Sequence, residues 1–118
     1  DFRSPDGSDP LTWCLAAGAA MAAASAGPAS IRLRLGPTEQ TIAVPPAHQV
    51  VDTLGAGDVL HGAALAALAY ACDPSTYAAV LAFAAQVATA SVEFPGALGW
   101  ATDPSTLARV RGAIAALR

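Results

Sequence analysis

Two aspartates, Asp52 and Asp58, enclose the segment Gly55-Ala56-Gly57, and a long apolar run follows them. The apolar residues after this segment recur at helical spacing, which predicts a helix that begins near Asp58 and ends near Tyr70. Small residues let the backbone approach a ligand closely, and the free N–H groups and the dipole of a helix start favour an anion. The segment therefore predicts a site for an anionic group.

An aspartate beside an anion site has a chemical use of its own. A carboxylate would only repel the anion if binding were the sole purpose of the loop. Asp58 could instead take a proton from a hydroxyl group that attacks a bound phosphoryl group, while the N–H groups absorb the charge that develops during transfer. The residues alone leave a structural alternative open, in which Asp58 caps the helix and Asp52 caps a turn.

The first part of the chain predicts one helix followed by strands. Pro10, preceded by Asp9, predicts a helix to about Ala17 that Gly18 closes. The uncharged residues 19–25 predict a buried strand, which ends at a turn formed by Gly27 and Pro28.

A hairpin is expected next. Ile31, Leu33 and Leu35 alternate with two arginines, which predicts a half-exposed strand with Arg32 and Arg34 on its solvent side. A turn at residues 36–37 and a second arm at residues 40–44 complete the predicted hairpin.

Two helices are expected after the glycine-rich loop and its helix. Both start at an Asp-Pro pair, at residues 73–74 and 103–104, and residues 95–96 separate them. The uncharged run between Asp73 and Glu93 contains several hydroxyl side chains and has no flanking lysine or arginine. We expect a buried helix of a soluble fold there, not a membrane span.

The bulk properties limit the function classes. The chain has 118 residues, 54% of them hydrophobic and 13% charged, with a net charge of −3 and a pI of about 5.0. These values fit one domain or part of one, and they do not favour binding to nucleic acid or to an anionic membrane. Cys14 and Cys72 lack the spacing of metal ligands, so we expect two free thiols in a cytoplasmic protein.

The sequence DTLGAGD, Asp52 to Asp58, resembles the C-terminal signature D-T-x-G-A-G-D of the ribokinase-like (PfkB-type) carbohydrate kinase family. The resemblance implies that Asp58 is the catalytic base and that Gly55, Ala56 and Gly57 form the anion hole for the transferred phosphoryl group. It implies either a monovalent cation such as K⁺ near Asp52 or a purely structural role for Asp52 in the turn.

Other segments resemble the nucleotide site of the same family. The sequence SAGPAS, residues 25–30, resembles the family's T-x-G-x-x-G, with serine in place of the threonine and of the second glycine. The resemblance implies nucleotide contacts from Ser25, Gly27 and Thr53. Residues 83–97 resemble the helix and loop that wall the adenine pocket, which would place Ala85 and Ala88 against the base. Plain core packing is the alternative for Ala88.

The prediction as a whole is the C-terminal, ATP-binding and catalytic portion of a ribokinase-like kinase, residues 1–118, without the N-terminal part and the lid. The expected fold is α/β, part of a three-layer α/β/α domain with short strands and a hairpin covered by helices. The expected reaction moves the γ-phosphoryl group of ATP, with Mg²⁺, to a hydroxymethyl group of a small sugar or sugar-like alcohol. We expect the isolated portion to be inactive, and relatives suggest a homodimer for the complete protein.

Three alternatives remain open at this point. The first is a nucleoside kinase of the same family, and the second is a nucleotide-binding regulator that has lost turnover. The third is a structural helical module whose glycine loop binds nothing.

Overall fold

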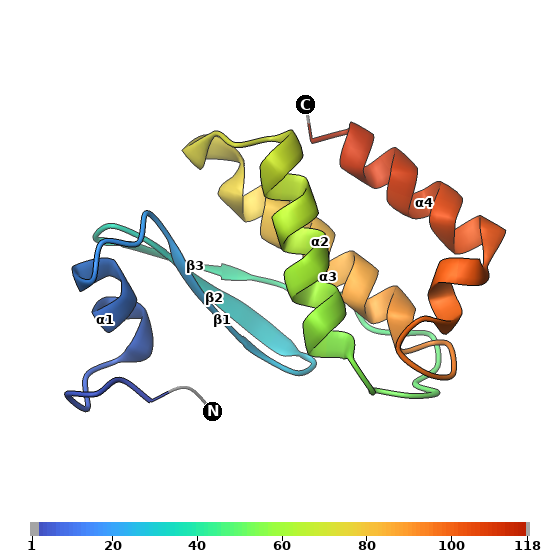
Figure 1. Ribbon diagram of the computed structural model, residues 1–118, viewed down its shortest axis with the longest axis horizontal. Helices are drawn as coiled ribbons and strands as arrows, with labels where there is room; N and C mark the ends of the chain where they lie inside the picture. Colours follow the sequence, from blue (N-terminus) through green and yellow to red (C-terminus); the bar gives the residue numbers. More distant parts are fainter. Residues whose placement is uncertain (1–2, 118) are drawn as a thin grey trace. The chain divides into compact units, whose positions relative to one another are not determined.

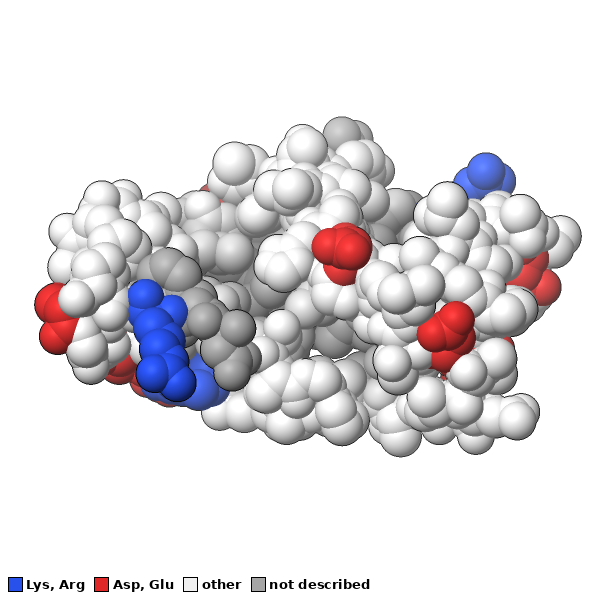
Figure 2. All heavy atoms as spheres, turned by 60° about the horizontal axis from the view of Figure 1, so that its bottom comes forward, with Lys and Arg blue, Asp and Glu red and all other residues white. Residues whose placement is uncertain are grey.

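The computed structural model describes residues 3–117, which form two compact units, one up to Ile42 and the other from Ala43 onward (Figure 1). The first unit combines one helix with a small sheet, and the second is helical. The chain is therefore mixed α/β. Most of the face drawn in Figure 2 is covered by uncharged side chains, in keeping with the charged fraction of 13%.

The first unit contains helix α1 (Pro10–Ala16) and an antiparallel sheet in the order β1-β2-β3, built from strands Ala22–Ala26, Ala29–Leu35 and Thr38–Ile42. The helix begins as predicted, because Asp9 accepts a hydrogen bond from the Thr12 N–H at 3.2 Å and proline occupies the first helical position. The hairpin forms as predicted, with its second arm two residues earlier than expected.

The central strand β2 shows the predicted alternation. Ile31 and Leu33 are buried, at 1% and 0% exposure, whereas Arg32 between them is exposed. The prediction of a buried strand at residues 19–25 was wrong about burial. A strand forms there, but only Ala22 in it is buried, because β1 is an edge strand whose one neighbour in the described sheet is β2.

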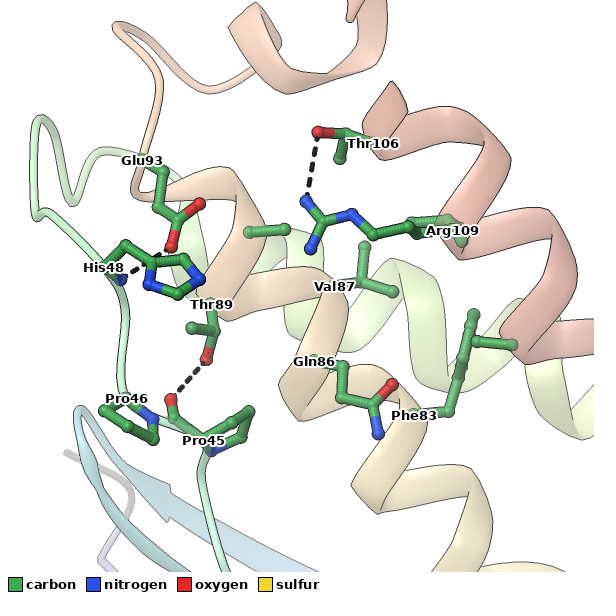
Figure 3. A pocket seen from close by; sticks show the side chains of 13 residues that line it. Pro45, Pro46, His48, Phe83, Gln86, Val87, Thr89, Glu93, Thr106 and Arg109 are labelled. Atoms are coloured by element: carbon green, nitrogen blue, oxygen red, sulfur yellow. Dashed lines mark hydrogen bonds between the residues drawn. The ribbon is translucent and has the colours of Figure 1, made fainter. Parts of the chain in front are cut away.

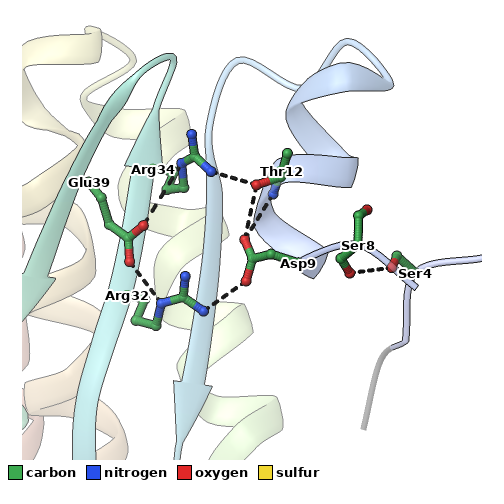
Figure 4. Close-up of polar contacts among 7 residues, drawn as sticks. All are labelled: Ser4, Ser8, Asp9, Thr12, Arg32, Arg34 and Glu39. Carbon is green, nitrogen blue, oxygen red and sulfur yellow. Dashed lines mark hydrogen bonds and ion pairs between the residues drawn. The ribbon is translucent and has the colours of Figure 1, made fainter. Parts of the chain in front are cut away.

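Arg32 of β2 is exposed as predicted, whereas Arg34 is half-buried, and both side chains have partners. Arg32 contacts Asp9 at 3.0 Å and Glu39 at 2.8 Å, and Arg34 donates to the Thr12 hydroxyl at 2.6 Å (Figure 4). Hydrogen bonding to Arg32 lowers the pKa of both Asp9 and Glu39 and raises the pKa of Arg32 itself. The pairs therefore join the start of α1 to strands β2 and β3.

The second unit contains helices α2 (Ala56–Tyr70), α3 (Tyr77–Ser91) and α4 (Pro104–Ala115), with short 3₁₀ turns at Pro74–Thr76 and Gly99–Thr102. Both Asp-Pro starts are confirmed. Asp73 accepts from the Ser75 N–H at 2.8 Å, and Asp103 accepts from the Thr106 N–H at 2.8 Å. The 3₁₀ turn delays α3 itself to Tyr77.

The core of this unit lies between α2, α3 and α4. Its buried centre consists of Ala67, Val80, Phe83 and Val87, and partly buried side chains of α2 and α4 pack around it. The alanines of α2 allow close approach to α3, so a chain rich in alanine can still build this core. Among residues 3–117, none of the helices combines the length and the apolarity that crossing a bilayer requires.

Candidate functional site

The glycine-rich loop, residues 52–58, is fixed to the end of α3 by the backbone. The N–H groups of Val51 and Asp52 both donate to the carbonyl of Val92, at 2.7 Å and 3.1 Å. Since Val92 directly follows the last residue of α3, the segment that leads into the loop is anchored to a rigid element.

Asp52 holds the loop in shape through both of its carboxylate oxygens. One oxygen accepts the N–H of Leu54 at 2.9 Å, which closes a local turn, and the other accepts the N–H of Gly96 at 2.9 Å. These N–H groups, that of Leu54 above all, lower the pKa of the Asp52 carboxyl group. The geometry matches the structural role that the sequence left open for Asp52, because its charge serves the loop backbone.

The lowered pKa of Asp52 predicts a specific dependence of stability on pH. A carboxyl group whose pKa is lower in the folded state than the usual 3.8 stabilises the fold above that pH, and the contribution is lost as the pH falls through the folded-state pKa. We expect Asp52→Asn to be less stable than the wild type near neutral pH, and we expect this difference to shrink below about pH 4. Urea unfolding of both proteins at a series of pH values measures it. A difference that stays constant down to about pH 3 would contradict the role assigned to the charge.

Gly55 is the helix N-cap residue, and the structure demands a glycine there. Its φ of 73° lies in the left-handed region, and a Cβ atom added to it would lie 2.7 Å from the Cβ of Ala97. Gly57 differs from it, because nothing lies within 4 Å of a Cβ added there and its φ is not positive. The fold itself therefore needs Gly55 but leaves open space at Gly57.

Asp58 is an exposed side chain in the first turn of α2, and it forms no hydrogen bond or ion pair with any other described residue. Because Gly55 is the N-cap, the alternative in which Asp58 caps this helix is wrong. His61, one turn on, does not engage Asp58: its Nδ1 lies 2.7 Å from the carbonyl oxygen of Gly57. The carboxylate of Asp58 therefore has no structural role in the described contacts and is available to a ligand.

Backbone donors lie next to this carboxylate. The Ala56 N–H donates to the carbonyl of Thr53 at 3.2 Å, and the helical ladder starts with the Val59 N–H, which donates to Gly55 at 2.9 Å. The N–H groups of Gly57 and Asp58, between these two, have no acceptor within the described part of the chain. Free donors at a helix start can bind an oxyanion, and in this turn of α2 they lie beside the unpaired carboxylate of Asp58.

The other residues predicted for the site are distributed over both units. Thr53 is exposed on the loop itself, and on α3 Ala88 is half-buried whereas Ala85 is buried at 1% exposure. Ser25, at the end of β1, and Gly27, in the turn after it with a φ of 56°, are exposed in the first unit. In the second unit, the structure brings the loop together with residues 96–97.

The contact of Ala97 with the loop was missed by sequence reasoning. No periodicity or charge pattern marks Ala97 in the sequence. Its Cβ can lie close to the loop because the residue that faces it, 42 positions earlier in the chain, is Gly55, which has no side chain. Across residues 3–117, no three or more His, Cys, Asp or Glu side chains gather in a group that could hold a metal ion.

Comparison with known proteins gives a family and a fold. The model of the pfkB family of carbohydrate kinases matches residues 8–102, which include every residue predicted for the site. No curated protein matches the chain. A solved nucleoside kinase of Burkholderia thailandensis, in complex with inosine, superposes with a TM-score of 0.68 at 20% identity. The match covers 84% of this chain and 32% of that one, and at this identity it shows a shared fold.

Proposed function

This chain belongs to the pfkB family of carbohydrate kinases, and from that premise we propose that it carries the phosphoryl-transfer site of an ATP-dependent kinase. Its acceptor would be a hydroxymethyl group of a small sugar or sugar-like alcohol. The observation that carries the proposal is the exposed, unpaired carboxylate of Asp58 beside two free N–H groups at the start of α2.

Each part of the loop has a role in the proposed reaction. Asp58 would accept the proton of the acceptor hydroxyl as that oxygen attacks the γ-phosphorus of ATP. The predicted anion hole of Gly55, Ala56 and Gly57 is revised here, because the Ala56 N–H already donates to the carbonyl of Thr53. We propose that the N–H groups of Gly57 and Asp58, at the positive end of the α2 dipole, donate to the oxygens of the transferred group as charge builds up on them. Asp52 and Gly55 would hold these donors in place through the contacts with residues 96–97.

The loop fits a phosphate group, because the free N–H groups and the open space at Gly57 leave room for its oxygens. Thr53, Ser25, Gly27 and Ala88 are the proposed further contacts of the nucleotide. Ala85 was also predicted to contact the base, but it is buried at 1% exposure and is therefore left out of the proposal. Mg²⁺, bound with ATP, would neutralise phosphate charge. A K⁺ ion near Asp52 is a separate proposal, which a comparison of rates in K⁺ and Na⁺ salts tests.

The acceptor class is decided by a direct assay. The protein that contains this chain is given ATP with Mg²⁺ and either a pentose, the matched pentose without its hydroxymethyl oxygen, or a nucleoside such as inosine. We expect ADP formation with the pentose and none with its deoxy counterpart. ADP formation that is equal with both pentoses would contradict the proposed acceptor.

Nucleoside kinase activity is the second candidate, because a solved structure that shares this fold is a nucleoside kinase with bound inosine. A rate with inosine well above the rate with any pentose would favour it. Nucleotide binding without transfer to any acceptor would favour the regulator. We also propose that the 118-residue chain by itself transfers no phosphoryl group, which the same assay tests.

A further inference from the structure

A pocket of about 300 Å³ lies within the second unit, between residues 45–48, α3 and α4 (Figure 3). No residue of the glycine-rich loop lines it, and neither does Ala85 or Ala88. Its volume is at the lower end of the range for sites that bind small organic molecules. The individual residues proposed to contact the phosphoryl group and the nucleotide therefore do not line this pocket, although α3, which contributes to its wall, belongs to the segment 83–97 that resembles the wall of the adenine pocket.

The walls of the pocket are held in place by hydrogen bonds. The hydroxyl of Thr89 on α3 donates to the carbonyl of Pro45 at 3.0 Å, and the His48 N–H donates to the Glu93 carboxylate at 2.8 Å. Two consecutive prolines stiffen the segment between these anchors. The pocket is thus largely formed before any ligand arrives, which lowers the cost of ordering on binding.

Apolar side chains make up one part of the lining. Phe83 and Val87 of α3 belong to the buried core, and Val110 and Ala113 of α4 pack against that core. A ligand with an apolar body would remove this surface from water, which favours binding in proportion to the apolar area covered.

The polar lining is asymmetric. Figure 3 shows the guanidinium of Arg109 at one side of the pocket, where it lies 3.4 Å from the hydroxyl of Thr106. Within residues 3–117, no carboxylate lies within ion-pair distance of Arg109. On the opposite side lies Glu93, whose oxygen already accepts the His48 N–H. An anionic group is therefore favoured at Arg109 and disfavoured at Glu93.

We propose that this pocket binds a small organic anion, with its carboxylate on Arg109 and its apolar body against Phe83, Val87 and Val110. Arginine presents several N–H donors in a planar arrangement that matches a carboxylate, and charge-assisted hydrogen bonds of this kind are the strong ones. A purely apolar molecule would make no use of the guanidinium charge, and a bare inorganic anion would leave the apolar lining uncovered.

Benzoate is a suitable probe, because it combines a carboxylate with a small apolar ring. Ligand-observed NMR on the protein that contains this chain measures binding of benzoate, benzyl alcohol and inorganic phosphate. We expect benzoate to saturate with a Kd on the order of 1 mM and the other two to bind at least about tenfold more weakly. This readout needs no kinase activity, so its result is independent of the proposed reaction.

Two variants of α4 distinguish an effect of the pocket arginine on benzoate binding from an effect of the net surface charge. Both Arg109 and Arg111 are exposed, but only Arg109 lines the pocket. We expect Arg109→Gln to weaken benzoate binding about tenfold or more, and Arg111→Gln, which removes the same charge two residues away, to leave it unchanged. Circular dichroism of both variants checks that the fold is intact.

A variant that fills the pocket completes the test. Ala113→Leu adds apolar volume to the lining and keeps Arg109, so we expect it to weaken benzoate binding as well. The proposal is overturned if benzoate does not saturate, if Arg109→Gln and Arg111→Gln act equally, or if benzyl alcohol binds as tightly as benzoate.

Discussion

Gly55→Ala is expected to lower the free energy of unfolding by roughly 2–5 kcal/mol, because alanine in the left-handed region and an added methyl group in a filled space both cost energy. At this residue φ is 73°, and the new Cβ would lie 2.7 Å from the Cβ of Ala97. A loss of this size is a large part of the stability of a typical domain. Urea unfolding of the wild type and the variant measures it.

Gly57→Ala is the matched control for this prediction. A Cβ at Gly57 meets nothing within 4 Å, and alanine is the better helix former, so we expect stability to stay the same or to rise by up to about 1 kcal/mol. The methyl group would, however, occupy the space proposed for the phosphoryl group. If the methyl group pushes the phosphoryl group away from the N–H donors, which alanine keeps, we expect kcat to fall by about 10²–10³, as when one such donor no longer reaches the transition state. A stable Gly57→Ala variant with unchanged kcat would show that no phosphoryl group reacts there, and equal stability of the two variants would contradict the Gly55 geometry.

Asp58→Asn is expected to lower kcat by about 10²–10⁴, the usual range for removal of a positioned general base. The carboxylate is exposed and has no partner among the described residues, so its charge stabilises the fold only weakly, through the dipole of α2. We therefore expect the unfolding transition and the affinity for ATP to change little. Steady-state kinetics, together with thermal unfolding and nucleotide titration, measure all three.

Asp73→Asn provides the control for the charge change. Asp73 also lies at a helix start, where it accepts the Ser75 N–H, but it is outside the loop. Asparagine can accept the same hydrogen bond, so kcat should not change. A fall in kcat of less than about tenfold for Asp58→Asn, or an equal fall for Asp73→Asn, would remove Asp58 from the role of base.

The elements that carry the site were predictable from local patterns. Helical spacing after Gly57 predicted α2, and the two Asp-Pro pairs predicted the starts at residues 73 and 103, because each signal acts within one turn of the chain. The seven residues from Asp52 to Asp58 also resembled a family signature, and the match of the pfkB family model to residues 8–102 confirms that family.

The support of the loop could not be predicted in this way. Asp52 accepts a hydrogen bond from the N–H of Gly96, and Gly55 lies against Ala97. Both contacts join positions more than forty residues apart in the sequence. The partners of Arg32 were missed for a different reason, since alternation along a strand shows which side faces outward but not which side chains lie there. Burial of the strand after α1 was predicted wrongly, because an uncharged run of alanines has the same sequence pattern in an edge strand and in a central strand.

For Asp58, the structure excludes one of the two roles that the sequence allowed. The residues alone allowed a base or a helix cap, and the structure excludes the cap because Gly55 takes that position. What remains is an unpaired carboxylate beside free N–H groups, which supports the proposed base but is not itself a reaction.

The most direct test of this site is ³¹P NMR of the product formed from ATP and the best acceptor, by wild type and by Asp58→Asn at equal enzyme concentration. We predict that the wild type gives a phosphomonoester whose phosphorus couples to the two protons of one CH₂ group, as a phosphorylated hydroxymethyl group requires, and that the variant gives essentially none in the same time. Undiminished product with Asp58→Asn, or phosphorus coupled to a single CH proton, would contradict the account.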